Sequence, residues 1–225
     1  MRVLITGGAS GLGAAVVQRV AEEGGRPLVV DLRPAADGVE SVQVDLSDRR
    51  AAESAVHFLA RSADGLDAVV TAAGVDACGK LADVSADNWE RVIQVNLLGT
   101  AAVVRAALPY LAIADNGRVV TCASTLGLRA LSDATAYCAS KFGVVGFTRA
   151  LAAETAGQIG VTMLLPGGMD TAFFDGRDEQ YKPPPDAKLN RPEDVAAAVM
   201  FALRQPPGCE VRELLVCPSE EPSWP

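Results

Sequence analysis

Short apolar runs alternate with helical patterns along the whole chain, and this alternation restricts the fold more than any other feature. Seven runs are apolar on both faces, as in parallel strands that helices cover on each side. They are VLIT (3–6), PLVVD (27–31), SVQVD (41–45), DAVVTA (67–72), RVVTCA (118–123), VTMLL (161–165) and ELLV (213–216). Helical patterns occur at 12–23, 48–62, 87–112, 134–156 and 193–204. The sequence predicts one α/β domain over residues 1–225, a three-layer, doubly wound parallel sheet of about seven strands.

Composition excludes several classes of protein. The chain has 225 residues and is 49 % apolar, which is enough for a single core and too apolar for disorder. Its net charge is −8 and it contains no run of Lys or Arg, so we expect no nucleic-acid partner and no anionic membrane surface. The longest apolar region, 97–114, is interrupted by Arg105 and Pro109, which favours a buried helix over a membrane span.

The cysteine and histidine content argues against disulfides and metals. Five cysteines form no C-x-x-C pair, and an odd number fits a reducing cytoplasm better than a disulfide framework. The N-terminal MRVLITGG enters a strand without a signal-peptide pattern, so we expect a cytoplasmic protein. His57 is the only histidine, and we expect no metal site and no Ser-His-Asp array.

A glycine-rich turn, TGGASGLG (6–13), follows the first predicted strand. Glycines at Gly7, Gly11 and Gly13 let the backbone turn sharply and let a diphosphate approach the free N–H groups of the next helix. Ala14 after the last glycine excludes a P-loop, and Leu12 excludes a nucleophile elbow. The spacing is not G-x-G-x-x-G, so an ordinary glycine-rich turn remains an alternative.

Asp31 ends the second predicted strand, where a carboxylate can accept hydrogen bonds from both hydroxyls of an adenosine ribose. A 2′-phosphate there would meet like charge, and Ser10 offers no cation for it, so we favour NAD over NADP. Arg33 is the one residue that complicates this preference, because it can take the 2′-phosphate. Asp45 either borders the adenine or serves as a turn or cap residue.

The stretch YCASK places Tyr137 and Lys141 four residues apart on a predicted helix, where they share a face. An ammonium about 5 Å from the phenol favours the phenolate by about 3 kcal/mol at an effective dielectric near 20. We therefore expect the pKa of Tyr137 to be lowered by about two units before desolvation opposes the effect. A phenol tuned in this way can exchange a proton with a substrate oxygen near neutral pH.

The chain resembles the short-chain dehydrogenase/reductase family over nearly its whole length. The matching stretches are TGGASGLG, TAAG (71–74), VNLLGT (95–100), TCASTLG (121–127), YCASK and PGGMDT (166–171), in that order. The resemblance implies a Rossmann-type fold and an NAD(P)-dependent oxidoreductase that transfers hydride between nicotinamide and a secondary alcohol or ketone.

The resemblance also implies roles for individual residues. Tyr137 would be the acid/base, Lys141 would lower its pKa and hold the nicotinamide ribose, and Ser124 would bind the substrate oxygen. Asn96 would lie at an irregularity in its helix and order a water near Lys141. The implied cofactor-binding residues are Gly7, Ser10, Gly11, Leu12, Gly13, Asp31, Asp45, Leu46, Ala72, Ala73, Gly74, Tyr137, Lys141, Pro166, Gly167 and Thr171.

One departure from the family pattern is Thr71, which replaces the commoner Asn; we expect its hydroxyl to substitute for the amide in part. Two alternatives to the NAD-linked enzyme stay open. One is an NADPH-preferring carbonyl reductase, and the other is a catalytically silent dinucleotide-binding sensor or scaffold.

Residues 168–190 are long for a connection and contain Phe173, Phe174 and Tyr181. We expect a substrate-binding lid there, although the aromatics can equally pack the loop onto its own domain. The two apolar helices at 87–112 and 134–156 resemble those that pair between subunits in the family, which implies a homodimer or homotetramer.

Overall fold

Seven parallel strands form the central sheet in the order β3-β2-β1-β4-β5-β6-β7. This computed structural model describes residues 1–224. The strands are β1 (Arg2–Thr6), β2 (Arg26–Asp31), β3 (Glu40–Gln43), β4 (Ala68–Thr71), β5 (Arg118–Cys122), β6 (Gly160–Pro166) and β7 (Glu213–Val216). Each strand overlaps one of the seven predicted apolar runs, and the predicted parallel sheet is confirmed.

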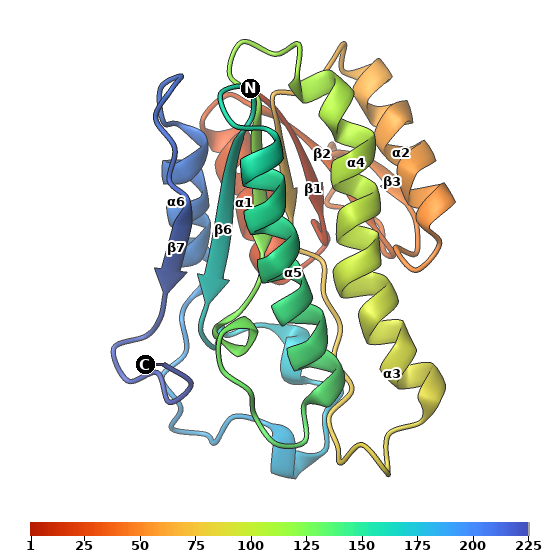
Figure 1. The fold of residues 1–225 in the computed structure, drawn as a ribbon, viewed down its shortest axis with the longest axis vertical. Helices are drawn as coiled ribbons and strands as arrows, with labels where there is room; N and C mark the ends of the chain where they lie inside the picture. The colour runs from red at the N-terminus through yellow and green to blue at the C-terminus, as the bar shows by residue number, and fades with distance from the viewer. Residues whose placement is uncertain (225) are drawn as a thin grey trace.

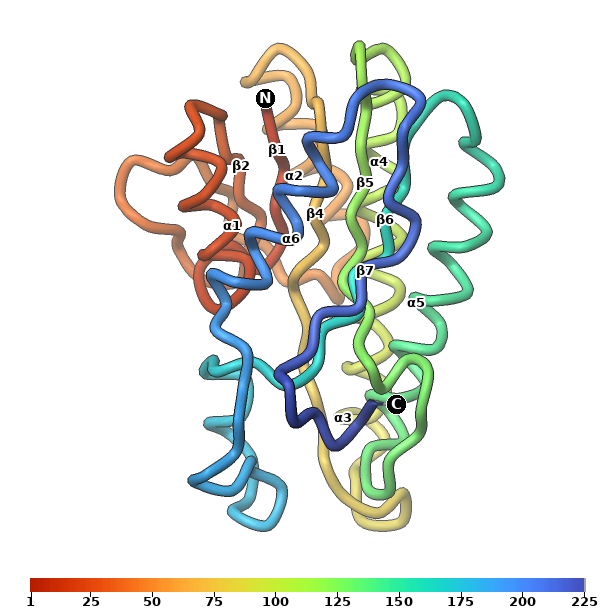
Figure 2. The backbone as a smooth tube through the Cα atoms, turned by 90° about the vertical axis from the view of Figure 1, so that its left-hand side faces the viewer, coloured from red at the N-terminus to blue at the C-terminus, as the bar shows by residue number. Residues whose placement is uncertain are grey.

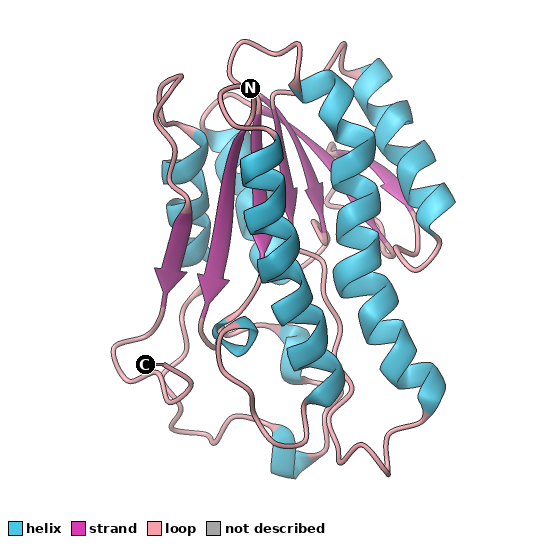
Figure 3. Cartoon of the chain, in the orientation of Figure 1, coloured by secondary structure: helices cyan, strands magenta, loops and turns pink. Residues whose placement is uncertain are grey.

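Helices cover both faces of the sheet (Figures 1 and 3). The α-helices are α1 (Gly11–Glu22), α2 (Arg49–Ser62), α3 (Ala86–Ile93), α4 (Thr100–Leu111), α5 (Thr135–Glu154) and α6 (Pro192–Leu203). One face packs on α1 and α6 through a core that includes Val16 and Val199. The other packs on α2, α4 and α5 through a core that includes Leu59, Val103 and Leu151. Burial on both sides explains why the runs of the inner strands are apolar throughout, whereas the edge strands β3 and β7 are only partly buried.

The predicted helix over 87–112 is continuous but not uniform. Between α3 and α4 the backbone forms a π-helical segment, Gln94–Gly99. The combined helix Ala86–Leu111 is the one helix in the described part of the chain long and apolar enough to cross a membrane, and 56 % of its most apolar window is buried inside the protein. Its apolar side is used in packing against the sheet.

The carboxyl ends of the strands gather the loops that carry the predicted functional residues. The chain leaves β1 toward β2 and β3 on one side and leaves β4 toward β5, β6 and β7 on the other. The carboxyl ends of β1 and β4 therefore form the crevice where ligands bind in open α/β sheets. The segment 168–190 and the C-terminal residues lie at this same end (Figure 2).

Candidate active site

A single large cavity of about 1630 Å³ lies at the carboxyl ends of the strands. Every predicted cofactor-binding residue except Gly13 lines it, as do Ser124, Tyr137 and Lys141. Small-molecule pockets usually measure about 300–1,000 Å³, so this cavity has room for an extended ligand beside a substrate. Gly13 and Asn96 do not line the cavity, but each contacts a residue that does, Gly7 and Val75 respectively.

The glycine turn is shaped by close contacts within the protein. Gly7 has φ +73°, and a Cβ on it would lie 2.8 Å from the Cα of Ala73. A Cβ on Gly13 would overlap the carbonyl oxygen of Gly7. These two glycines thus bring the start of α1 and the end of β4 against the turn. No side chain caps the start of α1, so its first N–H groups face the cavity without a side-chain acceptor.

A carboxylate and a guanidinium mark the far end of the cavity. Asp31 is 9 % exposed, and its two oxygens accept hydrogen bonds from the backbone N–H of Ala9 (3.0 Å) and of Arg33 (2.9 Å). The guanidinium of Arg33 donates to the hydroxyl of Ser10 at 2.5 Å. A fixed negative charge and a cation therefore stand side by side where the sequence suggests an adenosine ribose.

Asp45 is held as a turn residue beside this end. Its carboxylate accepts from the backbone N–H of Ser47 at 2.9 Å and from Arg91 at 3.0 Å. Burial alone would raise the pKa of Asp45, but the hydrogen bonds from Ser47 and the charge of Arg91 hold it below its usual value. Leu46 is buried next to it and also lines the cavity.

Asn96 lies in the π-helical segment, so the irregularity implied by the resemblance is confirmed. Its side chain is fully buried and bonds directly to the main chain of Val75: Oδ1 accepts from the N–H at 2.8 Å, and Nδ2 donates to the carbonyl at 2.9 Å. Nδ2 also donates to Ser140 at 3.1 Å. Asn96 thus fixes the loop that follows Gly74 at the centre of the cavity wall.

Tyr137 and Lys141 lie on one face of α5, as predicted, and both line the cavity that the glycine turn lines. The ammonium of Lys141 lies 5.5 Å from the centre of the Tyr137 ring and donates to the carbonyl of Cys122 at 2.8 Å. Ser124, 7 % exposed, accepts from the backbone N–H of Leu126 at 3.1 Å and hydrogen-bonds to Tyr137.

The expected lowering of the pKa of Tyr137 by Lys141 is wrong for the protein alone. Burial raises the pKa of Tyr137 well above its usual value, and hydrogen bonding to Ser124 only partly opposes this. Burial also lowers the pKa of Lys141, which is 4 % exposed. The cost of removing the phenolate from water, which opposes the attraction of Lys141, is the larger effect here.

The departure at Thr71 leaves a gap in the hydrogen bonding. Its hydroxyl is buried, and it has no hydrogen-bond partner among residues 1–224. The expectation that this hydroxyl replaces part of an asparagine's bracing is therefore wrong. Its neighbours in register are Thr6 of β1 and Thr121 of β5. The hydroxyl of Thr6 accepts from the N–H of Ala73, and the hydroxyl of Thr121 bonds to Thr148.

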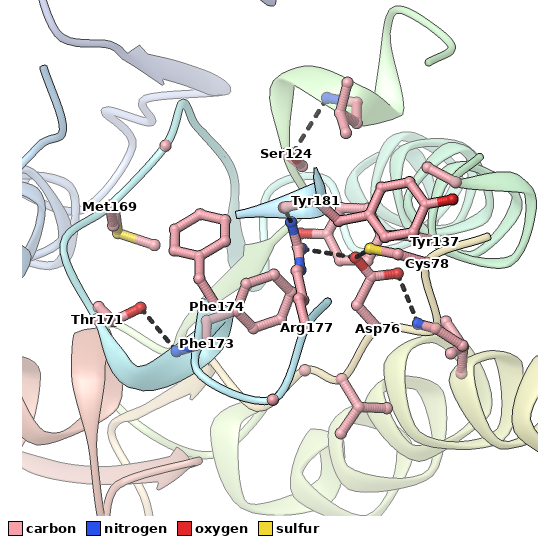
Figure 4. A pocket seen from close by; sticks show the side chains of 18 of the residues that line it. Asp76, Cys78, Ser124, Tyr137, Met169, Thr171, Phe173, Phe174, Arg177 and Tyr181 are labelled. Atoms are coloured by element: carbon pink, nitrogen blue, oxygen red, sulfur yellow. Dashed lines mark hydrogen bonds and ion pairs between the residues drawn. The ribbon is translucent and has the colours of Figure 1, made fainter. Parts of the chain in front are cut away.

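Several cavity residues escaped the sequence analysis. Arg177 from the 168–190 segment pairs with Asp76, which follows β4, and Cys78 donates its thiol hydrogen to the same carboxylate (Figure 4). Burial and then Asp76 raise the pKa of Cys78 to about 12, so this thiol stays protonated. Glu221 accepts from the backbone N–H of Gly168 at 2.9 Å. The Asp76–Arg177 and Gly168–Glu221 contacts join residues 101 and 53 positions apart, and no sequence pattern links residues at such separations.

The described residues contain no cluster of three or more His, Cys, Asp or Glu side chains that could hold a metal ion. All five cysteines are free. His57 on α2 bonds to Tyr110 on α4, and neither residue lines the cavity; Cys138 is buried.

Comparison with known proteins identifies the family of this chain. The family profile described as short chain dehydrogenase matches residues 1–182. An uncharacterized oxidoreductase of Staphylococcus aureus strain MW2 is 31 % identical over 96 % of both chains. A glycine betaine reductase of Emericella nidulans is 32 % identical over 97 % of this chain but only 19 % of its own length.

Solved structures share the fold. An aldohexose dehydrogenase of Thermoplasma acidophilum has a TM-score of 0.88 at 23 % identity, covering 96 % of this chain and 92 % of its own. A short chain dehydrogenase of Burkholderia cenocepacia, solved with NADP, has a TM-score of 0.82 at 26 % identity and 96 % coverage of both chains. The chain belongs to the short-chain dehydrogenase family and is an oxidoreductase of that family.

Proposed function

We propose that the protein transfers hydride between a nicotinamide dinucleotide and a secondary alcohol or ketone, with Tyr137 as the acid/base. One observation carries this proposal: Tyr137, Lys141 and Ser124 line the same cavity as the glycine turn and Asp31. The cofactor supplies or accepts the hydride. The protein's part is to bind, to orient and to move one proton.

The residues of the cavity fit a dinucleotide along its length. The uncapped start of α1 at Gly11, Leu12 and Gly13 would hold the diphosphate, with Gly7 and Ser10 beside it. Asp31 would hold the adenosine ribose, and Asp45, with Leu46 beside it, would border the adenine. Lys141 would hold the second ribose beside Ala72, Ala73 and Gly74, and Pro166, Gly167 and Thr171 would line the nicotinamide side.

Proton transfer follows from the state of Tyr137. Burial keeps its phenol protonated, which is the form that gives a proton to a carbonyl oxygen during reduction. Ser124 would steady the charge that develops on the substrate oxygen. The ammonium of Lys141, 5.5 Å from the ring centre, would offset part of the phenolate charge left behind.

NAD remains the preferred cofactor because Asp31 is a buried carboxylate that would face a 2′-phosphate. NADP is the second candidate, favoured by Arg33, whose guanidinium reaches Ser10 beside that position. Two solved structures with the same fold carry an NADP-type ligand. They are the alcohol dehydrogenase of Thermococcus sibiricus, with 5-hydroxy-NADP, and the short chain dehydrogenase of Burkholderia cenocepacia, with NADP.

A panel of ketones and secondary alcohols, assayed by nicotinamide absorbance with each cofactor, tests the proposal. Turnover of at least one substrate, with tighter binding of NADH than NADPH, is the expected result. Tighter NADPH binding would favour the second candidate. Binding of either cofactor without turnover of any member would favour the silent sensor or scaffold.

We also infer that the protein assembles as a homodimer or homotetramer. Phe142 on α5 is 46 % exposed, and Ile113, two residues after α4, is 83 % exposed; they lie in or directly after the helical regions that the resemblance pairs between subunits. Light scattering of the purified chain tests this inference, and a single species at the mass of one chain would contradict it.

A further inference from the structure

One buried ion pair joins two segments that are 101 residues apart. Nη2 of Arg177 lies 2.6 Å from Oδ2 of Asp76, and the two side chains are only 18 % and 6 % exposed. Water screens such a pair weakly, and the loss of one partner leaves a buried charge without compensation. We call this pair the Asp76–Arg177 clasp.

The Asp76 side of the clasp is fixed to the sheet. Val75, the preceding residue, has both its N–H and its carbonyl bonded to the buried amide of Asn96. The carboxylate of Asp76 also accepts from the backbone N–H of Ala77 at 2.7 Å and from the thiol of Cys78 at 3.2 Å. This carboxylate is therefore a rigid anchor with three partners: Arg177, the N–H of Ala77 and the thiol of Cys78.

The Arg177 side gathers residues 172–181, which we call the docking segment. The guanidinium lies 4.9 Å from the ring centre of Phe173 and 4.6 Å from that of Phe174, and Nη1 donates to the carbonyl of Tyr181 at 3.3 Å (Figure 4). Phe173 in turn packs on Tyr137, with ring centres 5.7 Å apart. One cation thus organises the aromatic residues that face the proposed acid/base.

The clasp is not fully satisfied. Nε of Arg177 is buried and has no hydrogen-bond partner in the described part of the chain. An unpaired buried donor destabilises the docked state, and opening the docking segment would let water reach it. The docked arrangement therefore carries a penalty that opening relieves, which makes opening less costly than the buried ion pair alone suggests.

We propose that Asp76 and Arg177 are positioning residues: their ion pair docks residues 172–181 onto the loop after β4 and sets Phe173 as the wall of the substrate site beside Tyr137. The docking itself is independent of the reaction, whereas its effect on turnover rests on the proposed function. The docking segment is the central part of the lid expected at 168–190. It places the apolar ring of Phe173 in the wall of the cavity.

The charges of the clasp also act on Tyr137, and they act in opposite directions. The charged or titratable groups that face the phenol are Cys122, Lys141, Asp76 and Arg177, with Ser124 bonded to it. Asp76 raises the pKa of Tyr137 and Arg177 lowers it. A docked clasp presents nearly zero net charge to the phenol, whereas the loss of either partner leaves the other uncompensated.

Hydrogen–deuterium exchange of the full chain tests the docking without any substrate. The variants are Asp76→Asn, Arg177→Gln and the double variant, with Glu179→Gln as control. Glu179 lies in the same segment, is 88 % exposed and pairs only with Lys182 in the described structure. A buried charge-assisted hydrogen bond contributes about 1.5–3 kcal/mol, so each single variant should speed exchange across 172–181 by about tenfold or more. The double variant should exchange no faster than the faster single variant, and the control should match the wild type.

Unchanged exchange in either single variant, or single effects that multiply in the double variant, would overturn the clasp. The Tyr137→Phe variant separates this proposal from the reaction, because it should lose turnover and keep the protection of 172–181. If the wild-type protein turns over nothing, the proposed function fails while the exchange experiment still decides the clasp.

Turnover of the best substrate in the panel, measured against pH, distinguishes positioning from a general structural defect. Asp76→Asn should move the profile to lower pH and Arg177→Gln should move it to higher pH, since the two charges act on Tyr137 with opposite sign. Shifts in the same direction, or no shift in either variant, would contradict the positioning role.

Discussion

Removal of the Asn96 amide should destabilise the fold. In Asn96→Ala the N–H and the carbonyl of Val75 both lose their partner, at 2.8 and 2.9 Å in the native protein. A buried polar group left unpaired costs about 1–3 kcal/mol. Because Val75 is only half-buried, water recovers part of this cost, and about 1.5 kcal/mol for each group gives a loss of about 3 kcal/mol.

That loss would lower Tm by about 6–12 °C for a chain of this size. Urea unfolding followed by circular dichroism measures the free energy directly. Gln94→Ala is the matched control, because Gln94 lies in the same π-helical segment with an exposed side chain and should change stability by less than about 0.5 kcal/mol. If Asn96→Ala proves as stable as Gln94→Ala, the amide does not brace the Val75 loop.

Three further changes test separate parts of the structure. Thr71→Val removes a buried hydroxyl without a partner in residues 1–224 and should raise the free energy of unfolding by about 1 kcal/mol; a loss of stability would mean that the hydroxyl is bonded. Lys141→Met should stabilise the protein at pH 7 while ending turnover. Burial lowers the pKa of Lys141 in the folded protein below its usual 10.5, so the unfolded chain holds this proton more tightly. The free energy of unfolding of the wild type therefore rises as pH increases toward 10.5. Unfolding curves of Lys141→Met measured against pH should lack this rise. Asp31→Ser should strengthen NADPH binding relative to NADH in fluorescence titrations, and an unchanged ratio would remove the like-charge argument.

The sequence was sufficient for the sheet and for the loops that bring the predicted site residues to one cavity. Strands buried on both faces carry their own signature, and the loops that follow β1, β4, β5 and β6 must meet at one end of a parallel sheet. The spacing of Tyr137 and Lys141 likewise follows from helix geometry alone. These features depend on local pattern and on topology, which the order of residues contains.

Two features could not be obtained in this way. The sign of the pKa shift of Tyr137 depends on its burial by Phe173 and the surrounding cavity, which no spacing rule reports. The Asp76–Arg177 contact joins residues that are 101 positions apart, and it depends on how the irregular 168–190 segment folds against the loop after β4. Such contacts are decided by packing in three dimensions and leave no periodic trace.

The central claim is that Tyr137 moves the proton in the proposed reaction. Single-turnover measurements on wild type and Tyr137→Phe, with cofactor binding measured on the same samples, test it most directly. The account predicts that the variant binds NADH within about twofold of wild type and loses turnover by at least about 100-fold, the range for a missing general acid. Full turnover in Tyr137→Phe would contradict it.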